Sequence, residues 1–182
     1  DARAFGCVPT DSDGRVTAFL EKMDNPVTNA INAGCYVFSA SVVADIPLNK
    51  VVSVERETFP NLVNSGRPVF GYSEQSYWLD IGTPKALLKA STDIVLRTDQ
   101  KLVMPGASVD STAVISGGSC IGRDATVAAG THIDCSIVEA GAVIGSHAII
   151  TNSFIAAGAT VDNGAKITSS FVTKGEILPI PQ

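Results

Sequence analysis

The feature that most constrains the fold is a six-residue repeat in the second half of the chain. β-branched apolar residues recur every six positions from Val103 to Ile133, and beyond Ile133 the step shortens to five at regular intervals. A small residue, most often Ala, follows most of them four positions later. A period of six fits neither the α-helix nor the heptad coiled coil, and Gly does not occupy every third position as in collagen. The repeat therefore predicts a parallel β-helix.

The shortened steps give the geometry of the predicted coil. They fall in three segments, 133–138, 150–155 and 167–172, which start 17 residues apart. Because 17 is two steps of six and one of five, these coils should have three sides and one tightened corner, while the earlier coils run at 18 without a tightened corner. The β-branched and small residues should point inward, with Gly and polar residues at the corners, where positive φ is often needed. About four coils fit between residues 103 and 172.

Composition divides the chain near residue 102. Residues 103–182 carry only nine charged side chains, whereas most of the aromatic and charged residues of the 182 precede them. The prediction is two units, 1–102 and 103–182.

The formal net charge of −5 argues against a nucleic-acid partner, and no apolar run is long enough for a membrane helix. The four cysteines form no C-x-x-C motif, which favours free thiols and a cytoplasmic location.

Residues 1–102 are predicted to form an α/β unit, and they contain no Gly-rich phosphate loop. Apolar segments predict helices over 40–46 and 54–65, and a third begins at Pro84. Ser39 and Thr83 are the expected N-caps, and Pro60 should make the second helix irregular. Strands are expected over 5–8, 15–19, 32–38, 68–72 and 77–81.

Three stretches of this part carry polar groups suited to a phosphorylated sugar. The pair Glu21–Lys22 sets a hydroxyl acceptor beside a phosphate-binding cation. In the second stretch, Asn32 can donate and accept, and Gly34 leaves room for a ligand. Asp80 follows a predicted strand at the edge where α/β sheets bind ligands, and its carboxylate suits Mg²⁺. Taken singly, each has a structural reading: a solvated charge pair, a packing Gly and a helix-capping Asp.

The order of these motifs resembles one family. The segments F-L-E-K, I-N-A-G-C-Y, S-V-E-R-E-T-F-P and W-L-D-I-G-T-P are similar to those of the sugar-1-phosphate nucleotidyltransferases, and most similar to their mannose-1-phosphate guanylyltransferase (GDP-mannose pyrophosphorylase) branch. The resemblance covers residues 5–98, although Met23 stands where the family usually has Pro. The repeats resemble the hexapeptide family, whose left-handed parallel β-helix many of these nucleotidyltransferases carry at their C-terminus.

The resemblance implies an activity and a set of site residues. A sugar 1-phosphate, here mannose 1-phosphate, would attack the α-phosphorus of a nucleoside triphosphate, here GTP, and release pyrophosphate. Lys22 would bind the phosphate of the sugar, and Asp80 would bind Mg²⁺. The sugar would contact Glu21, Asn32, Gly34 and, as a weaker candidate, Glu55. The G-x-G-T-R-L loop of the family does not occur in this chain, so the nucleotide-binding half is expected to be missing and the chain alone to be inactive.

Alternatives remain open at this point. A glucose-1-phosphate nucleotidyltransferase shares the same fold, and some relatives are regulatory or scaffold subunits. Hexapeptide repeats also occur in acyltransferases that use a His as general base, for which His132 and His147 are the candidates. The β-helix leaves strand edges and flat faces to cover, so a homo-oligomer formed through it is expected.

Overall fold

The fold was analysed in a computed structural model that describes residues 2–181. The chain divides into two compact units, Asp1–Trp78 and Leu79–Gln182, and each is described by itself. The composition boundary at residues 102 and 103 lies further along the chain than this division. The two boundaries differ because the segment that starts at Leu79 contains a helix that packs on the repeats, and this segment therefore belongs to the second unit.

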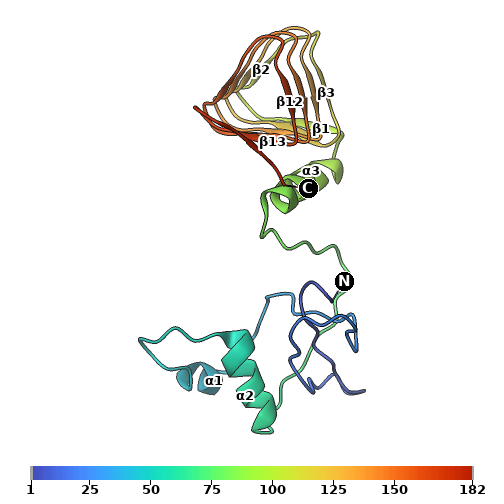
Figure 1. Cartoon of the computed structure of the whole chain (residues 1–182), viewed down its shortest axis with the longest axis vertical. Helices are drawn as coiled ribbons and strands as arrows, with labels where there is room; N and C mark the ends of the chain where they lie inside the picture. The colour runs from blue at the N-terminus through green and yellow to red at the C-terminus, as the bar shows by residue number, and fades with distance from the viewer. Residues whose placement is uncertain (1, 182) are drawn as a thin grey trace. The chain divides into compact units, whose positions relative to one another are not determined.

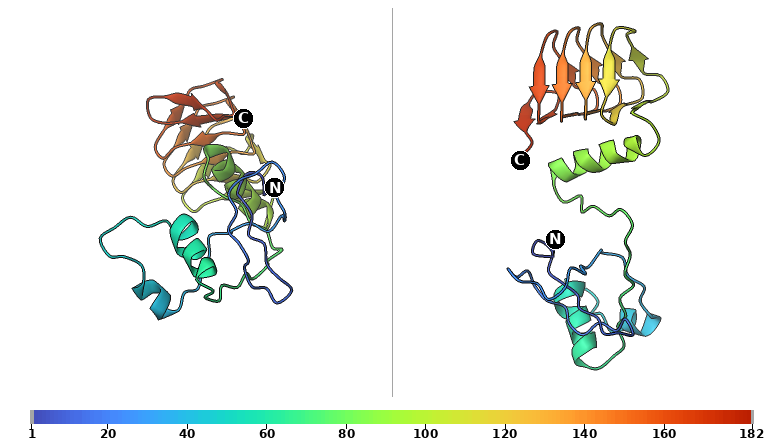
Figure 2. Two further views of the ribbon diagram at one scale, coloured as in Figure 1. Left: turned by 60° about the horizontal axis from the view of Figure 1, so that its bottom comes forward. Right: turned by 90° about the vertical axis from the view of Figure 1, so that its right-hand side faces the viewer.

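The second unit is a three-sided parallel β-solenoid, as the repeat predicted (Figure 1). Two views show its coils stacked along one axis (Figure 2). The first side contains β1 (Lys101–Val103), β4 (Ser119–Ile121), β7 (Ile137–Val138), β10 (Phe154–Ile155) and β13 (Ser170–Val172). The second side contains β2 (Ser108–Val109), β5 (Thr126–Val127), β8 (Val143–Ile144) and β11 (Thr160–Val161). The third contains β3 (Val114–Ser116), β6 (His132–Asp134), β9 (Ile149–Thr151) and β12 (Lys166–Thr168). The left-handed sense implied by the resemblance stays a prediction.

The strand register confirms the predicted coil lengths. On the third side Val114 pairs with His132, 18 residues later, whereas the next partners, Ile149 and Lys166, follow at intervals of 17. The tightened corner lies just after this side. There Cys135 has a positive φ of 46°, and Asn152 and Ser169 repeat it at 48° and 47°. The first coil instead turns through two glycines, 117 and 118, both with positive φ, and this extra residue makes it longer.

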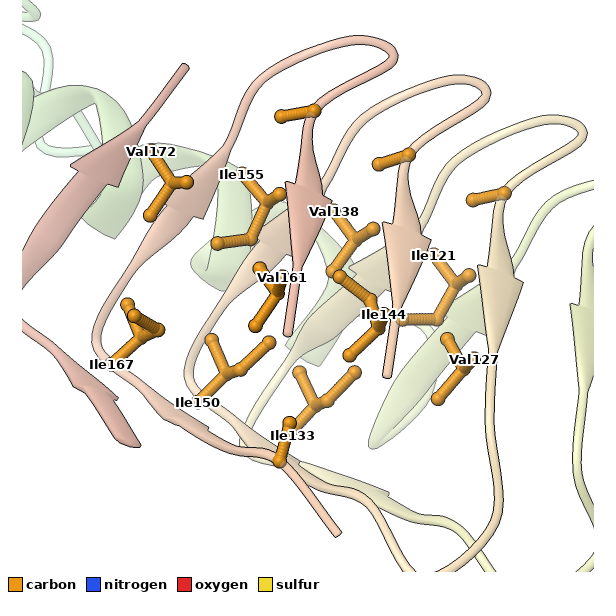
Figure 3. Close-up of a cluster of buried hydrophobic side chains, with 14 of the residues drawn as sticks. Ile121, Val127, Ile133, Val138, Ile144, Ile150, Ile155, Val161, Ile167 and Val172 are labelled. Carbon is orange, nitrogen blue, oxygen red and sulfur yellow. The ribbon is translucent and has the colours of Figure 1, made fainter. Parts of the chain in front are cut away.

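The core of the solenoid consists of the predicted apolar ladders. Figure 3 shows the labelled side chains pointing into the coil interior, stacked from one coil to the next. From Ile115 to Val172 the Ile and Val residues of the ladders are almost fully buried, whereas Val103 is 42% exposed and Val109 is partly buried. The small residues Ala125, Ala142 and Ala159 have no exposed surface. A small side chain and larger ones thus share each layer of the buried interior, the alternation by which close packing is reached.

A ladder of buried serines supports the tightened corner. Ser136 accepts a hydrogen bond at Oγ from the backbone N–H of Ser153 (3.0 Å) and donates from Oγ to the carbonyl of Asp134 (2.7 Å). Ser119 and Ser153 likewise each accept from the backbone N–H of the serine one coil later. Ser119, Ser136 and Ser153 have no exposed surface. The ladder therefore satisfies backbone donors that no solvent reaches.

We expect Ser136→Ala to lower the free energy of unfolding by about 1–3 kcal/mol, because it leaves the buried N–H of Ser153 without an acceptor. Urea denaturation followed by circular dichroism measures this. Ser108→Ala is the matched control, since Ser108 is exposed on β2, and it should change stability by less than about 0.5 kcal/mol. Equal effects of the two substitutions would show that the ladder contributes nothing.

Helix α3 (Pro84–Leu96) covers the first side of the solenoid. It begins as predicted, with Thr83 accepting at Oγ1 from the N–H of Ala86 (3.2 Å) and Pro84 in the first turn. Leu88 packs with Ile137 and Phe154 from that side. The chain ends with β14 (Ile177–Pro179), which pairs antiparallel with β13. This reversal covers an edge that a further parallel strand would otherwise extend.

The first unit confirms the predicted helices more closely than the predicted strands. It contains α1 (Ala40–Ala44), the π-helical segment η1 (Val54–Thr58) and α2 (Phe59–Asn64). The irregularity falls before Pro60, as expected, because Pro has no N–H to continue the α-helical ladder. Ser39 occupies the expected N-cap position of α1, but its side chain makes no capping bond and instead contacts the hydroxyl of Ser41 (3.0 Å).

The strands predicted over 32–38 and 77–81 do not form, and elsewhere in the first unit the pairing is reduced to isolated bridges. Within residues 2–78 the bridges are Cys7 with Leu20, Thr10 with Val16 and Arg15 with Phe70. Local patterning favours extended chain, but a strand also needs a neighbour for its ladder of hydrogen bonds. Val37 and Tyr72 are 101% and 89% exposed, so the described residues provide no such neighbour.

No helix within residues 2–181 is both long and apolar enough to cross a bilayer.

Candidate functional site

The first element of the site is the short bridge that positions Glu21 and Lys22. Cys7 and Leu20 exchange two backbone hydrogen bonds of 3.0 and 2.9 Å. Gly6 permits this approach, because a Cβ there would lie 2.5 Å from the carbonyl oxygen of Leu20. Glu21 and Lys22 follow directly and are both exposed. The bridge thus presents a carboxylate and an ammonium group at the surface of the first unit.

The second element is the start of η1, which carries Glu55 and Arg56. Ser53 accepts at Oγ from the N–H of Arg56 (3.2 Å), and the N–H of Ser53 donates to Oε1 of Glu57 (3.1 Å). This reciprocal pair of bonds resembles a capping box, with the Glu one position later than in that motif, and it fixes where the segment begins. The side chains of Glu55 and Arg56 therefore leave the first turn of a well-anchored segment.

An ion pair joins the two elements. The Nε atom of Arg56 lies 3.5 Å from Oε1 of Glu21, and both side chains are about three quarters exposed (77% and 76%). An exposed pair of this kind contributes little to stability because water screens it. It nevertheless brings two motifs together that lie 35 residues apart in the sequence.

The third element is a hydrogen-bonded cluster of Asn32, Tyr36 and Glu55. The Asn32 side-chain amide donates at 2.7 Å to the Tyr36 hydroxyl and at 2.7 Å to Oε1 of Glu55. The Tyr36 hydroxyl lies 3.4 Å from the same carboxylate oxygen and donates to it. On the other side of the amide, the N–H of Gly34 donates to Oδ1 of Asn32 (3.0 Å). Gly34 turns the chain with a φ of +78°, a conformation that Gly adopts without strain.

Tyr36 has a packed and partly desolvated environment. Its ring meets that of Phe59 edge-on, with centroids 4.9 Å apart, and lies 5.9 Å from that of Phe38. Burial raises the pKa of Tyr36, and the charge of Glu55 acts in the same direction, while the hydrogen bond from Asn32 opposes them. The phenol therefore stays protonated at neutral pH and serves as a donor to Glu55.

Trp78 anchors the segment that carries Asn32 and Gly34. Its indole N–H donates to the carbonyl of Ala33 (3.3 Å), and its ring meets that of Phe5 edge-on at 5.6 Å. Both contacts lie within the first unit. Because Ala33 stands between the two site residues, this bond fixes the backbone of the turn that the site uses.

The structure therefore joins most of the residues that the sequence selected. Glu21, Asn32, Gly34 and Glu55 belong to one connected cluster, through Arg56, and Lys22 adjoins Glu21 along the chain. Sequence reasoning missed Tyr36, Arg56 and Trp78 as members. Each stood inside a motif already selected, but no pattern in the sequence indicated which side chains those motifs would exchange.

Asp80 lies in the second unit, where it is exposed shortly before α3. Among residues 2–181 there is no group of three or more His, Cys, Asp or Glu side chains able to hold a metal. One carboxylate is a partial donor set for Mg²⁺, which keeps several waters and takes substrate phosphates as further ligands. Asp80 thus fits the role of a single protein ligand and no more than that.

The two histidines belong to the second unit, where both lie on the solenoid. His132 is exposed on β6, and His147 occupies a corner with a φ of 57°. The ring of His147 lies over Gly130, where a Cβ would come within 2.4 Å of Nδ1. The His147 ring therefore packs closely against the glycine corner of the preceding coil.

Comparison with known families agrees with these observations. Residues 1–96 match the nucleotidyl transferase family, and residues 97–177 match the GMPPB C-terminal domain. The chain thus belongs to the nucleotidyl transferase family, and within it to the sugar-1-phosphate nucleotidyltransferases.

Individual relatives extend the comparison. The chain is 46% identical over 161 residues to mannose-1-phosphate guanylyltransferase of Mycobacterium tuberculosis, an alignment covering 79% of this chain and 45% of that protein. It is 31% identical to mannose-1-phosphate guanylyltransferase 1 of Arabidopsis thaliana (80% and 44% covered). It is also 30% identical to UTP–glucose-1-phosphate uridylyltransferase of a Synechocystis species (58% and 28% covered). The chain thus spans about half the length of the first two relatives.

Proposed function

We propose that this chain provides the sugar-1-phosphate side of a nucleotidyltransferase site, with mannose 1-phosphate as the sugar substrate and GTP as the nucleotide. The observation that carries the proposal is the connected cluster, in which Arg56 contacts Glu21 while its neighbour Glu55 contacts Asn32. The names of the relatives support the choice of mannose and guanylyl groups.

Each residue has a role that follows from its chemistry. Lys22 offers an exposed cation for the phosphate, and Glu21 and Glu55 offer acceptors for sugar hydroxyls. Gly34, with nothing within 4 Å of a Cβ built on it, leaves space for the ring. In the reaction, an oxygen of the sugar phosphate forms a bond to the α-phosphorus of the nucleotide, and the bond to pyrophosphate breaks. Transfer of this kind depends on positioning and on neutralising phosphate charge.

Mg²⁺ is the proposed cofactor, with Asp80 as its ligand in this chain. When bound, the ion neutralises negative charge on the phosphate oxygens. Asp80 would hold it through one carboxylate, and the remaining positions would go to phosphate oxygens and water.

The described residues contain no Gly-rich phosphate loop, and this gives a sharp prediction. We expect the 182-residue chain to bind mannose 1-phosphate but to release no pyrophosphate when GTP, Mg²⁺ and mannose 1-phosphate are all supplied. Isothermal titration calorimetry measures the first property and a coupled pyrophosphate assay the second. Turnover by this chain alone would contradict the assignment of its residues to only one side of the site.

The choice between sugars is testable in the same way, since a uridylyltransferase for glucose 1-phosphate is among the relatives. The proposal expects mannose 1-phosphate to bind more tightly than glucose 1-phosphate. The reverse order would move the substrate assignment to glucose while keeping the site.

An acyltransferase role makes an opposite prediction for the histidines. Because His132 and His147 lie outside the cluster, replacing both by Ala should leave mannose 1-phosphate affinity within about twofold of the original, the effect usual for surface substitutions. A circular dichroism spectrum controls for folding. The acyltransferase alternative would be supported if the original chain transferred an acyl group to an acceptor and the two substitutions abolished that transfer.

A non-catalytic scaffold role would instead show as an absence of sugar-phosphate binding.

For assembly we propose a homo-oligomer formed through the solenoid. Its second side carries the outward-facing apolar side chain of Val143, which is 45% exposed. Sedimentation velocity at micromolar concentration should show a species larger than a monomer.

A cytoplasmic location is also proposed for the chain, because all four cysteines are unpaired, as is usual in a reducing compartment.

A further inference from the structure

The cluster around Glu55 contains one residue, Tyr36, to which neither the resemblance nor the comparisons give a role. Tyr36 and Asn32 both direct donors at the same oxygen, Oε1 of Glu55, from 3.4 and 2.7 Å. The other oxygen, Oε2, has no hydrogen-bond or ion-pair partner among residues 2–181, and the Glu55 side chain is exposed. One oxygen of the carboxylate is therefore held and the other is presented to solvent.

The orientation of the Asn32 amide is fixed from both sides. The N–H of Gly34 donates to Oδ1, so the amide nitrogen must face Tyr36 and Glu55. Both hydrogens of that nitrogen are then engaged, one by the phenol oxygen and one by the carboxylate. Among Asn32, Tyr36 and Glu55, this leaves the free carboxylate oxygen of Glu55 as the strongest remaining acceptor.

We propose that Tyr36 is a positioning residue that, together with Asn32, fixes the Glu55 carboxylate so that its free oxygen accepts a hydrogen bond from one particular sugar hydroxyl. The inference rests on the proposed function, because it specifies how that site distinguishes its sugar. A carboxylate held in place before the ligand arrives loses little entropy on binding. A site built to hydrogen-bond a hydroxyl also rejects ligands that lack it or place it differently.

Tyr36→Phe tests this by removing only the phenol oxygen while keeping the ring against Phe59. We expect the ratio of mannose 1-phosphate to glucose 1-phosphate affinity, measured by titration with each ligand, to fall by about 3- to 10-fold, the equivalent of one hydrogen bond. Tyr72→Phe is the matched control, because Tyr72 is 89% exposed on the same unit, and it should leave the ratio unchanged. A loss of affinity for both ligands by the same factor would show a purely structural role and overturn the inference.

Asn32→Asp adds a readout that a structural role would not produce. The substitution sets a second carboxyl group against Glu55, 2.7 Å from Oε1, and beside the Tyr36 hydroxyl. Two carboxylates this close share a proton, which raises the pKa of the pair. The two groups repel each other while both are ionised, and they can hydrogen-bond to each other once one of them is protonated. We therefore expect mannose 1-phosphate affinity, relative to the original chain at the same pH, to be about tenfold lower at pH 8 and to recover as the pH falls.

The outcomes separate the two proposals. If the unsubstituted chain binds neither sugar phosphate, the proposed function and this inference both fail. If it binds mannose 1-phosphate selectively but Tyr36→Phe keeps the selectivity and Asn32→Asp shows no recovery at low pH, only the positioning role of Tyr36 and Asn32 fails. Thermal melts of all variants establish that the first unit remains folded in each comparison.

Discussion

Replacing Lys22 by Ala is expected to weaken mannose 1-phosphate binding by about 10- to 100-fold. Lys22 is the exposed cation that adjoins Glu21 at the edge of the cluster, and a hydrogen bond to a charged group contributes roughly 1.5–3 kcal/mol. Calorimetric titration of the chain measures the loss. The effect should shrink as salt is raised, because screening weakens the attraction between exposed charges.

A matched variant shows whether the loss is specific. Lys166 is exposed on β12 of the solenoid, so Lys166→Ala removes the same charge from the chain without touching the cluster. Affinity should then stay within about twofold of the original. If Lys22→Ala and Lys166→Ala weaken binding equally, the phosphate is attracted by net charge alone and Lys22 has no particular role.

The largest expected effect on stability comes from Ile150→Ala. Ile150 has no exposed surface and stacks in register between Ile133 and Ile167, as Figure 3 shows. We expect the free energy of unfolding to fall by about 3–5 kcal/mol, because the lost apolar contacts leave a cavity that the rigid coils cannot close. Chemical denaturation measures it.

The residue beside it on β9 is the natural control. Ile149 points outward and is 41% exposed, so Ile149→Ala should cost less than about 1 kcal/mol. The contrast tests the register directly, because a shift of one residue would exchange the two positions. A larger loss for Ile149→Ala than for Ile150→Ala would mean that the ladders run through the other face.

The solenoid was predictable in detail because its repeat is both local and redundant. Each coil constrains the next, so the five-residue step at 133–138 sufficed to predict a tightened corner, which the positive φ of Cys135 confirms. The first unit is different. Its segment 32–38 has the composition of a strand, yet a strand requires a partner that local sequence does not specify, and none pairs with it within the described residues.

For the candidate site, the sequence indicated residue types better than their connections. Asn32, Gly34 and Glu55 were selected from motifs, and the structure joins them by hydrogen bonds. Tyr36 was not selected, although it lies in the same motif as Asn32 and Gly34. Its role depends on the side chain reaching Glu55, 19 residues away, a contact that no spacing rule predicts. Asp80 as a metal ligand stays a prediction.

The most direct test of the central claim is a nuclear magnetic resonance titration of the isotope-labelled 182-residue chain with mannose 1-phosphate. We expect saturable shifts of the backbone amides of Lys22, Gly34 and Glu55, with the solenoid amides, including those of His132 and His147, unmoved. Shifts confined to the solenoid, or none at millimolar ligand, would contradict the assignment of a sugar-phosphate site to the cluster around Asn32 and Glu55.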